Sequence, residues 1–261
     1  GRKALITYIT AGDPHPDHTL AIMHTLVEAG ADIIELGVPF SDPMADGPII
    51  QAACERALAH RTSLSMVLDI VHEFRQSNER TPIVLMGYQN PIEVMGINQF
   101  ARTANQSQVD AVLTVDLPVE QAKPALEIYR QHAIDVIFLI APTTSSARIK
   151  KICDCSSGFV YYVSLKGVTG ALHLDISGVR DKVADIKQVS TLPVGVGFGI
   201  KDAESAKTIA SISDAVVVGS AVIQQIAEDL SNHKVMHQSI KSLLMSMREA
   251  MDSDSVKKEV A

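Results

Sequence analysis

The sequence predicts an α/β fold in which eight parallel strands alternate with outer helices and close into a (β/α)8 barrel. Short apolar runs rich in β-branched residues alternate with longer amphipathic stretches along the chain. The runs are apolar throughout, as expected for parallel strands covered on both faces. The length of 261 residues fits one barrel domain spanning 1–261, and an open doubly wound sheet is the alternative.

Eight segments have this strand character, which is the number of strand–helix units that closes a barrel. In chain order they are Ala4–Thr10, Ala31–Val38, Ile83–Tyr88, Ala111–Val115, Val136–Ile140, Phe159–Ser164, Val194–Phe198 and Ala215–Val218. Helical periodicity is found between them, as at Pro16–Ala29, Ser63–Gln76, Glu120–His132 and Ala203–Ser211. The terminal segment Asp252–Ala261 is predicted to be a frayed tail.

The composition is that of an ordinary globular protein, with 46% hydrophobic and 20% charged residues. A formal net charge of -7 gives a nucleic-acid partner no electrostatic basis. No apolar run is long enough to span a membrane and no signal peptide is visible, so a cytoplasmic location is expected. Because the sequence begins at Gly1 rather than Met, we expect that the natural N-terminus has been trimmed.

No metal site is predicted. The odd, sparse set of cysteines favours a reducing compartment and free thiols. They are Cys54, Cys153 and Cys155, and the last two lack the spacing of a zinc site. Two histidine pairs have usable spacings but no Glu or Cys partner in a recognised pattern, so surface histidines are expected at His15 and His18 and at His233 and His237.

A carboxylate lies inside the second predicted strand. Strand side chains alternate, so Glu35 and Ile33 share one face and Leu36 takes the other. Leu36 suits the helix-covered face, which points Glu35 into the barrel near the C-terminal strand ends, where barrel enzymes do their chemistry. Glu35 is either a structural partner of an interior lysine or a general acid/base with a raised pKa. No other predicted strand carries Lys or Arg in its core run, which favours the second interpretation.

The loop after this strand, Ser41–Pro48, is stiff and acidic, with two aspartates and two prolines. An aspartate held above a strand end can stabilise a developing cation or accept a proton. Asp-Pro and Asp-Gly are also ordinary turn pairs, so Asp42 and Asp46 remain open between these two roles on local sequence alone.

Glycine-rich strand ends at Gly195–Ile200 and Val216–Ala221 predict a phosphate site, since each precedes a helical pattern. Loops after the seventh and eighth strands are the recurrent phosphate site of barrels, and tight-turn glycines are the alternative. The segment Ser164–Gly178 resembles a mobile lid because of its glycines, and simple flexibility is the alternative. Within it, Lys166 offers a charge that could attract an anion.

Five motifs, in this order, resemble the tryptophan synthase alpha subunit family of TIM barrels. They are Gly12–Pro14 (GDP), Glu35–Pro48 (ELGVPFSDPMADGP), Gly167–Gly170 (GVTG), Gly197–Ile200 (GFGI) and Gly219–Ala221 (GSA). The resemblance extends over nearly the whole chain. It implies a carbon–carbon lyase of tryptophan biosynthesis that cleaves indole-3-glycerol phosphate to indole and glyceraldehyde 3-phosphate by a retro-aldol reaction. It also implies an alpha2-beta2 tetramer in which the partner beta subunit, not this chain, carries pyridoxal phosphate.

The resemblance further implies roles for individual residues. Glu35 matches the acid/base carboxylate and Asp46 the loop aspartate that interacts with the indole nitrogen. Supporting positions are Tyr161, beside the glutamate, and Thr169, the lid residue that closes over the aspartate. Phosphate binders are implied at Gly170, Gly199, Gly219 and Ser220, and indole-pocket walls at Phe198, Met86, Leu113 and Leu139. Positions similar to the partner-contact loops are Asp42, Asn90 and Pro118.

Two other functions remain as alternatives. One is a different phosphate-sugar barrel, such as an isomerase or epimerase, against which the pair of Glu35 and Asp46 and the apolar pocket argue. The other is a weakly active regulatory subunit that binds the phosphate ligand and switches its partner. The presence of both carboxylates argues against a dead site.

Overall fold

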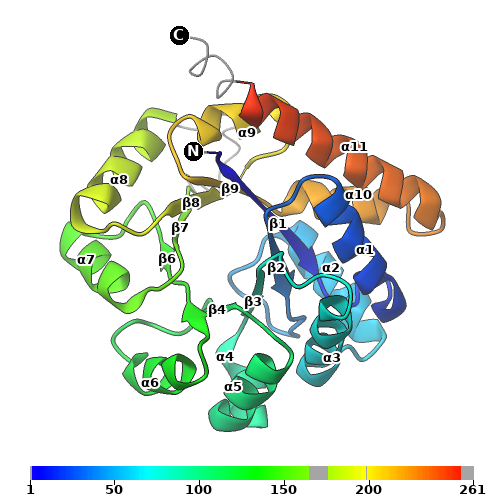
Figure 1. Ribbon diagram of the computed structural model, residues 1–261, viewed down its shortest axis with the longest axis horizontal. Helices are drawn as coiled ribbons and strands as arrows, with labels where there is room; N and C mark the ends of the chain where they lie inside the picture. The colour runs from blue at the N-terminus through cyan, green and yellow to red at the C-terminus, as the bar shows by residue number, and fades with distance from the viewer. Residues whose placement is uncertain (1, 165–175, 198, 254–261) are drawn as a thin grey trace.

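In the computed structural model a central ring of parallel strands is surrounded by helices (Figure 1). The structure describes residues 2–164, 176–197 and 199–253. The hydrogen-bonded strand order is β5-β4-β3-β2-β1-β9-β8-β7-β6. The strands are β1 (Ala4–Thr10), β2 (Ile33–Gly37), β3 (Ile83–Gly87), β4 (Ala111–Thr114), β5 (Asp135–Val136), β6 (Leu139–Ile140), β7 (Val160–Val163), β8 (Val194–Gly197) and β9 (Ala215–Val218).

Strands β5 and β6 are two parts of one barrel strand, the predicted Val136–Ile140. β5 pairs with β4 and β6 pairs with β7, so the two ends of the strand order meet here. The two residues between them keep both neighbours bonded. The Ile137 amide donates to Val112 at 2.9 Å, and the Phe138 carbonyl accepts from Tyr161 at 3.2 Å. The predicted eight-stranded barrel is therefore confirmed, and the open doubly wound sheet is not observed.

The helices form the outer ring and pack over the strands (Figure 1). They are α1 (Pro16–Glu28), α2 (Pro48–Ala59), α3 (Leu64–Arg75), α4 (Gln89–Met95), α5 (Ile97–Gln106), α6 (Lys123–Gln131), α7 (Ser146–Cys155), α8 (Ile176–Val189), α9 (Ala203–Ala210), α10 (Ser220–Glu228) and α11 (His233–Asp252). The predicted helix ranges agree to within a few residues. The largest difference is at α6, which begins at Lys123 rather than Glu120, with Pro124 in its first turn, where its missing N–H costs no hydrogen bond.

Two apolar clusters divide the interior. The inner cluster fills the barrel with side chains such as Ile6, Val84, Leu113 and Val217, and the outer cluster packs between strands and helices. Ile33 belongs to the inner cluster, and its alternating neighbours in β2 belong to the outer one. The alternation predicted for the second strand is therefore confirmed, and it directs the side chain of residue 35 inward.

The end of α11 is anchored, which corrects the expected start of the tail. Asp252 is the last residue of this helix, and the Arg248 guanidinium donates to its carboxylate at 2.6 and 2.9 Å. Arg248 also donates to the Lys3 carbonyl at 2.9 Å, which ties α11 to the start of β1. The remainder of the expected tail, residues 254–261, lies outside the described residues. Among the helices of the described ranges, none is long and apolar enough to cross a membrane.

Candidate active site

Glu35 lies in the barrel interior and is 1% exposed. Its register partners are Tyr8 on β1 and Val84 on β3. Its Oε1 atom has no hydrogen-bond partner among the described residues. Burial first, and the negative charge of Asp46 second, raise the pKa of Glu35 to about 8. Glu35 is thus a carboxylic acid that keeps its proton at neutral pH, which is the state a general acid needs.

Two tyrosines lie near this carboxyl group. Tyr8 on β1 and Tyr161 on β7 each extend over a glycine of the next strand, and a Cβ at Gly37 or Gly197 would overlap the tyrosine hydroxyl. Burial holds the pKa of both phenols well above the usual value, and the charge of Glu35 acts in the same direction. Tyr161 was expected beside Glu35. Tyr8 was not singled out, although an interior strand glycine signals close approach of a neighbour.

Asp46 lies on the β2–α2 loop and is held from two sides. Its carboxylate accepts a hydrogen bond from the Tyr88 hydroxyl at 2.9 Å, and its carbonyl accepts one from the Gln51 side chain at 2.8 Å. Burial raises the pKa of Asp46, and the Tyr88 hydrogen bond works against that rise. The negative charge of Asp46 in turn helps to raise the pKa of Glu35, so the two predicted carboxyl groups interact electrostatically. Sequence reasoning missed Tyr88 and Gln51.

The apolar positions expected to hold the indole come together. Met86, Leu113 and Leu139 come from β3, β4 and β6, and all three pack with the inner cluster. Leu139 also lines a hollow of about 500 Å³, which Ala45 lines from the Asp46 loop. This volume is in the range of small-molecule sites. Phe198, the fourth expected wall, lies outside the described residues.

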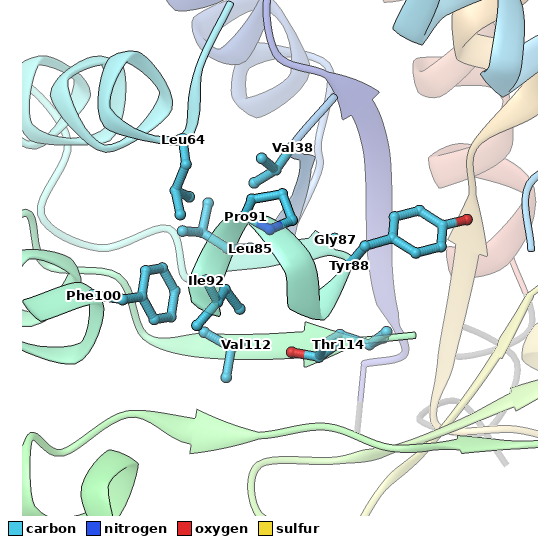
Figure 2. Close-up of a pocket in the computed structure, with 11 residues that line it drawn as sticks. Val38, Leu64, Leu85, Gly87, Tyr88, Pro91, Ile92, Phe100, Val112 and Thr114 are labelled. Atoms are coloured by element: carbon cyan, nitrogen blue, oxygen red, sulfur yellow. The ribbon is translucent and has the colours of Figure 1, made fainter. Parts of the chain in front are cut away.

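A second, much smaller cavity of about 10 Å³ lies behind β3 among Leu64, Ile92, Phe100 and Val112. Its lining is almost wholly apolar, and it has room for no more than about one water molecule. Figure 2 shows that the ring of Tyr88 extends away from these apolar side chains, with its hydroxyl on the far side from the cavity. The cavity is therefore too small to hold the substrate.

The expected phosphate end is described in part. Gly219 precedes the first turn of α10, and its carbonyl accepts from the Val222 and Ile223 amides. Ser220 is exposed at that helix N-terminus, and Gly199 has a left-handed φ of 74° that favours glycine. Three predicted residues, Lys166, Thr169 and Gly170, lie outside the described residues. Of the expected lid, Ser164 is described and donates to the Gly197 carbonyl at 3.0 Å, which joins the ends of β7 and β8.

The three positions expected at a partner interface are exposed on the segments that follow consecutive strands. Asp42 and Pro118 lie on the loops after β2 and β4, and Asn90 lies in the first turn of α4, after β3. Large apolar side chains are exposed on the first two of these segments. Met44 is 85% exposed and Val94, in α4, is 81% exposed.

The cysteines and histidines form no metal centre in the described part of the chain. All three cysteines are free, as predicted, and burial raises the pKa of the Cys54 thiol to about 11. The histidines, however, are not isolated on the surface. The ring centroids of His18 and His233 lie 3.7 Å apart, and the ring centroids of His15 and His60 lie 4.4 Å apart. This cluster joins α1, α11 and the α2–α3 turn, which sequence spacing did not reveal.

Comparison with known proteins gives one consistent result. The family model described as "Tryptophan synthase alpha chain" matches residues 1–252. The tryptophan synthase alpha chain of Thioalkalivibrio sulfidiphilus is 57% identical over 252 residues, covering 97% of this chain and 95% of the relative. That of Marinobacter nauticus is 56% identical over 253 residues, covering 97% and 94%.

Solved structures agree with the sequence comparison. The tryptophan synthase subunit alpha of Legionella pneumophila superposes with a TM-score of 0.89 at 44% identity, covering 96% of this chain and 93% of that one. A tryptophan synthase complex from Pyrococcus furiosus gives a TM-score of 0.84 at 39% identity, covering 95% and 99%. The chain therefore belongs to the tryptophan synthase alpha chain family, whose reaction is the lyase cleavage of indole-3-glycerol phosphate.

Proposed function

We propose that this chain cleaves indole-3-glycerol phosphate with Glu35 as the general acid and base and Asp46 as the stabiliser of the indole nitrogen. One observation carries the proposal. Glu35 is a buried carboxyl group without a basic partner among the described residues, its pKa is about 8, and the nearby carboxylate of Asp46 contributes to that rise. An acid with a raised pKa beside an ionisable partner is the arrangement that separates acid and base roles at neutral pH.

The reaction needs two proton transfers. Glu35 first gives its proton to the indole ring carbon that bears the glycerol phosphate side chain, and the positive charge that results is shared with the indole N–H. Asp46 accepts a hydrogen bond from that N–H and stabilises the charge. The Glu35 carboxylate then takes the proton of the side-chain hydroxyl next to the breaking bond. The carbon–carbon bond cleaves, the electron pair restores the neutral indole, and the new carbonyl leaves as glyceraldehyde 3-phosphate.

The other end of the substrate needs an anion site. The exposed Ser220 at the N-terminus of α10 and the Gly199 backbone support phosphate binding there. We assign Gly170 and Gly219 to the same end by their place in the family motif. Anchoring the phosphate would hold the indole against the apolar residues Met86, Leu113 and Leu139, so that binding energy is used for positioning.

We infer that the chain works with a beta subunit. A Pyrococcus furiosus structure is described as a tryptophan synthase complex, and another as an a2b2 complex, which supports an alpha2-beta2 tetramer here. The exposed Asp42, Asn90 and Pro118, with apolar Met44 nearby, fit the surface that such a partner would cover. The steps above use side chains of this chain alone. Pyridoxal phosphate is expected in the partner, and a cytoplasmic location remains the expectation.

The test is the release of indole from indole-3-glycerol phosphate, measured with and without a beta subunit. Glu35→Gln should fold normally and bind the substrate, but should lose cleavage by roughly 10²–10⁴-fold, the usual contribution of an acid–base group. The exposed Glu79→Gln is the matched control and should keep full activity. An active Glu35→Gln variant would overturn the assignment. Binding without indole release by the unaltered chain, even with a beta subunit, would instead favour the regulatory alternative.

A further inference from the structure

Tyr88 makes contacts that single it out near the site. It follows β3 directly and has an extended backbone, with φ -110° and ψ 156°. Its ring stacks on Phe40 of the β2–α2 loop, with centroids 5.1 Å apart, and the residue is only 5% exposed. The ring therefore connects the end of β3 to the loop that carries Asp46.

The direction of the hydrogen bonds at the Tyr88 hydroxyl is fixed. The Ala45 amide lies 3.0 Å from the hydroxyl oxygen and can only donate. The hydroxyl proton is then free to point at the Asp46 carboxylate, whose Oδ2 atom lies 2.9 Å away. A neutral donor with one fixed direction holds an ionised carboxylate in one position and orientation.

The backbone of Asp46 is held separately. Gln51, one turn into α2, donates to the Asp46 carbonyl at 2.8 Å, and the Asp46 amide donates to the Pro43 carbonyl at 3.0 Å. The Asp46 backbone is thus fixed by its own loop and by α2, whereas the carboxylate is oriented by the Tyr88 hydroxyl. Removing that hydroxyl should loosen the carboxylate and release the Ala45 amide, while the Asp46 backbone keeps its bonds to Pro43 and Gln51.

We propose that Tyr88 is a positioning residue for the cleavage reaction, which aims the Asp46 carboxylate at the indole nitrogen. The inference rests on the proposed role of Asp46. Because Asp46 acts on a charge that appears during the reaction, the loss of its positioning should lower kcat more than it raises KM. Because the Tyr88 hydrogen bond favours the charged form, its loss should move the acidic limb of the kcat/KM profile to higher pH.

The experiment compares Tyr88→Phe with Tyr129→Phe in the full chain, with the beta subunit present. Phenylalanine keeps the ring that stacks on Phe40 and removes only the hydroxyl. Tyr129 is the matched control, because its buried hydroxyl has no hydrogen-bond partner among the described residues. Tyr88→Phe should lower kcat by roughly 10- to 100-fold, as for a lost hydrogen bond to a charged group, and should shift the acidic limb upward. Tyr129→Phe should do neither.

A second pair of variants separates positioning from a merely structural role. In Asp46→Asn the carboxylate is already absent, so adding Tyr88→Phe should lower kcat much less than it does in the unaltered chain. Full additivity of the two losses, or an unchanged pH profile in Tyr88→Phe, would overturn the inference. If the Tyr88 inference is overturned in this way while Glu35→Gln is inactive in the same assay, the proposed function still stands. If Asp46→Asn keeps full activity, both the role of Asp46 and the inference fail.

Discussion

Two carboxyl groups of this barrel are equally hidden but have opposite surroundings. Asp13, on the loop after β1, and Glu35, inside β2, are each 1% exposed. The Arg56 guanidinium on α2 donates two hydrogen bonds to the Asp13 carboxylate, at 2.6 and 2.9 Å. In the described ranges Glu35 forms no ion pair, and its Oε1 atom has no hydrogen-bond partner. Burial raises the pKa of both groups, but Arg56 opposes the rise at Asp13, whereas the charge of Asp46 adds to it at Glu35.

This difference supports the proposal that Glu35, and not Asp13, is the catalytic acid. Burial alone does not separate the two groups, because Asp13 is as buried as Glu35 and connects a loop to a helix. Among the described residues only Asp13 has a basic partner, so burial leaves the proton on the Glu35 carboxyl group at neutral pH. The structural ion pair that sequence analysis considered for Glu35 is thus found elsewhere, between Asp13 and Arg56.

Among the substitutions, the largest expected effect on stability at one pH comes from removing the cation at Asp13. Arg56→Met leaves a buried carboxylate without its partner and should lower the free energy of unfolding by about 3 kcal/mol. Urea denaturation followed by circular dichroism measures this. Lys150→Met removes one partner of an exposed pair with Asp154 and should change stability by less than about 0.5 kcal/mol. Equal losses in the two variants would contradict the structural role of the Asp13 pair.

A smaller effect should follow from crowding the site around Glu35. In Gly37→Ala the new Cβ would overlap the Tyr8 hydroxyl, and the resulting shift should cost about 1–3 kcal/mol. The control is Gly47→Ala, where a Cβ meets nothing within 4 Å and φ is -75°. Gly47 is the N-cap of α2, where alanine is a poorer cap, but alanine also restricts the unfolded chain, so the net change should stay below about 1 kcal/mol. Thermal unfolding compares the two, and a tolerant Gly37 would show that the site has more room than the structure indicates.

The third effect is a pH dependence of stability. The pKa of Glu35 is raised to about 8 in the folded chain, so the folded state holds a proton that the unfolded chain releases above its ordinary pKa near 4.5. The stabilisation is complete below that ordinary value and is lost as pH rises through about 8. Across this window Glu35 should lower stability by about 1.4 kcal/mol for each pH unit. Urea unfolding at several pH values should show that Glu35→Gln lacks this contribution, and parallel curves would contradict it.

Local patterns predicted the barrel and the position of Glu35. The alternation of side chains within one strand is a property of five consecutive residues, and it put Glu35 inside without knowledge of its neighbours. Contacts between distant segments had no comparable signal. Asp13 and Arg56 are 43 positions apart, and Asp46 and Tyr88 are 42 apart, so each pair exists only once the strands are assembled. The histidine cluster was missed for the same reason, because His18 and His233 meet only when α11 packs on α1.

The central claim is that an unpaired, protonated Glu35 drives the cleavage, and its most direct test is the pH profile of indole release. For the chain with its beta subunit, we expect kcat/KM to fall as pH rises through about 8, because Glu35 then loses the proton it must donate. Glu35→Gln should show only residual release at every pH. A Glu35→Gln variant with the activity and pH profile of the unaltered chain would contradict the account.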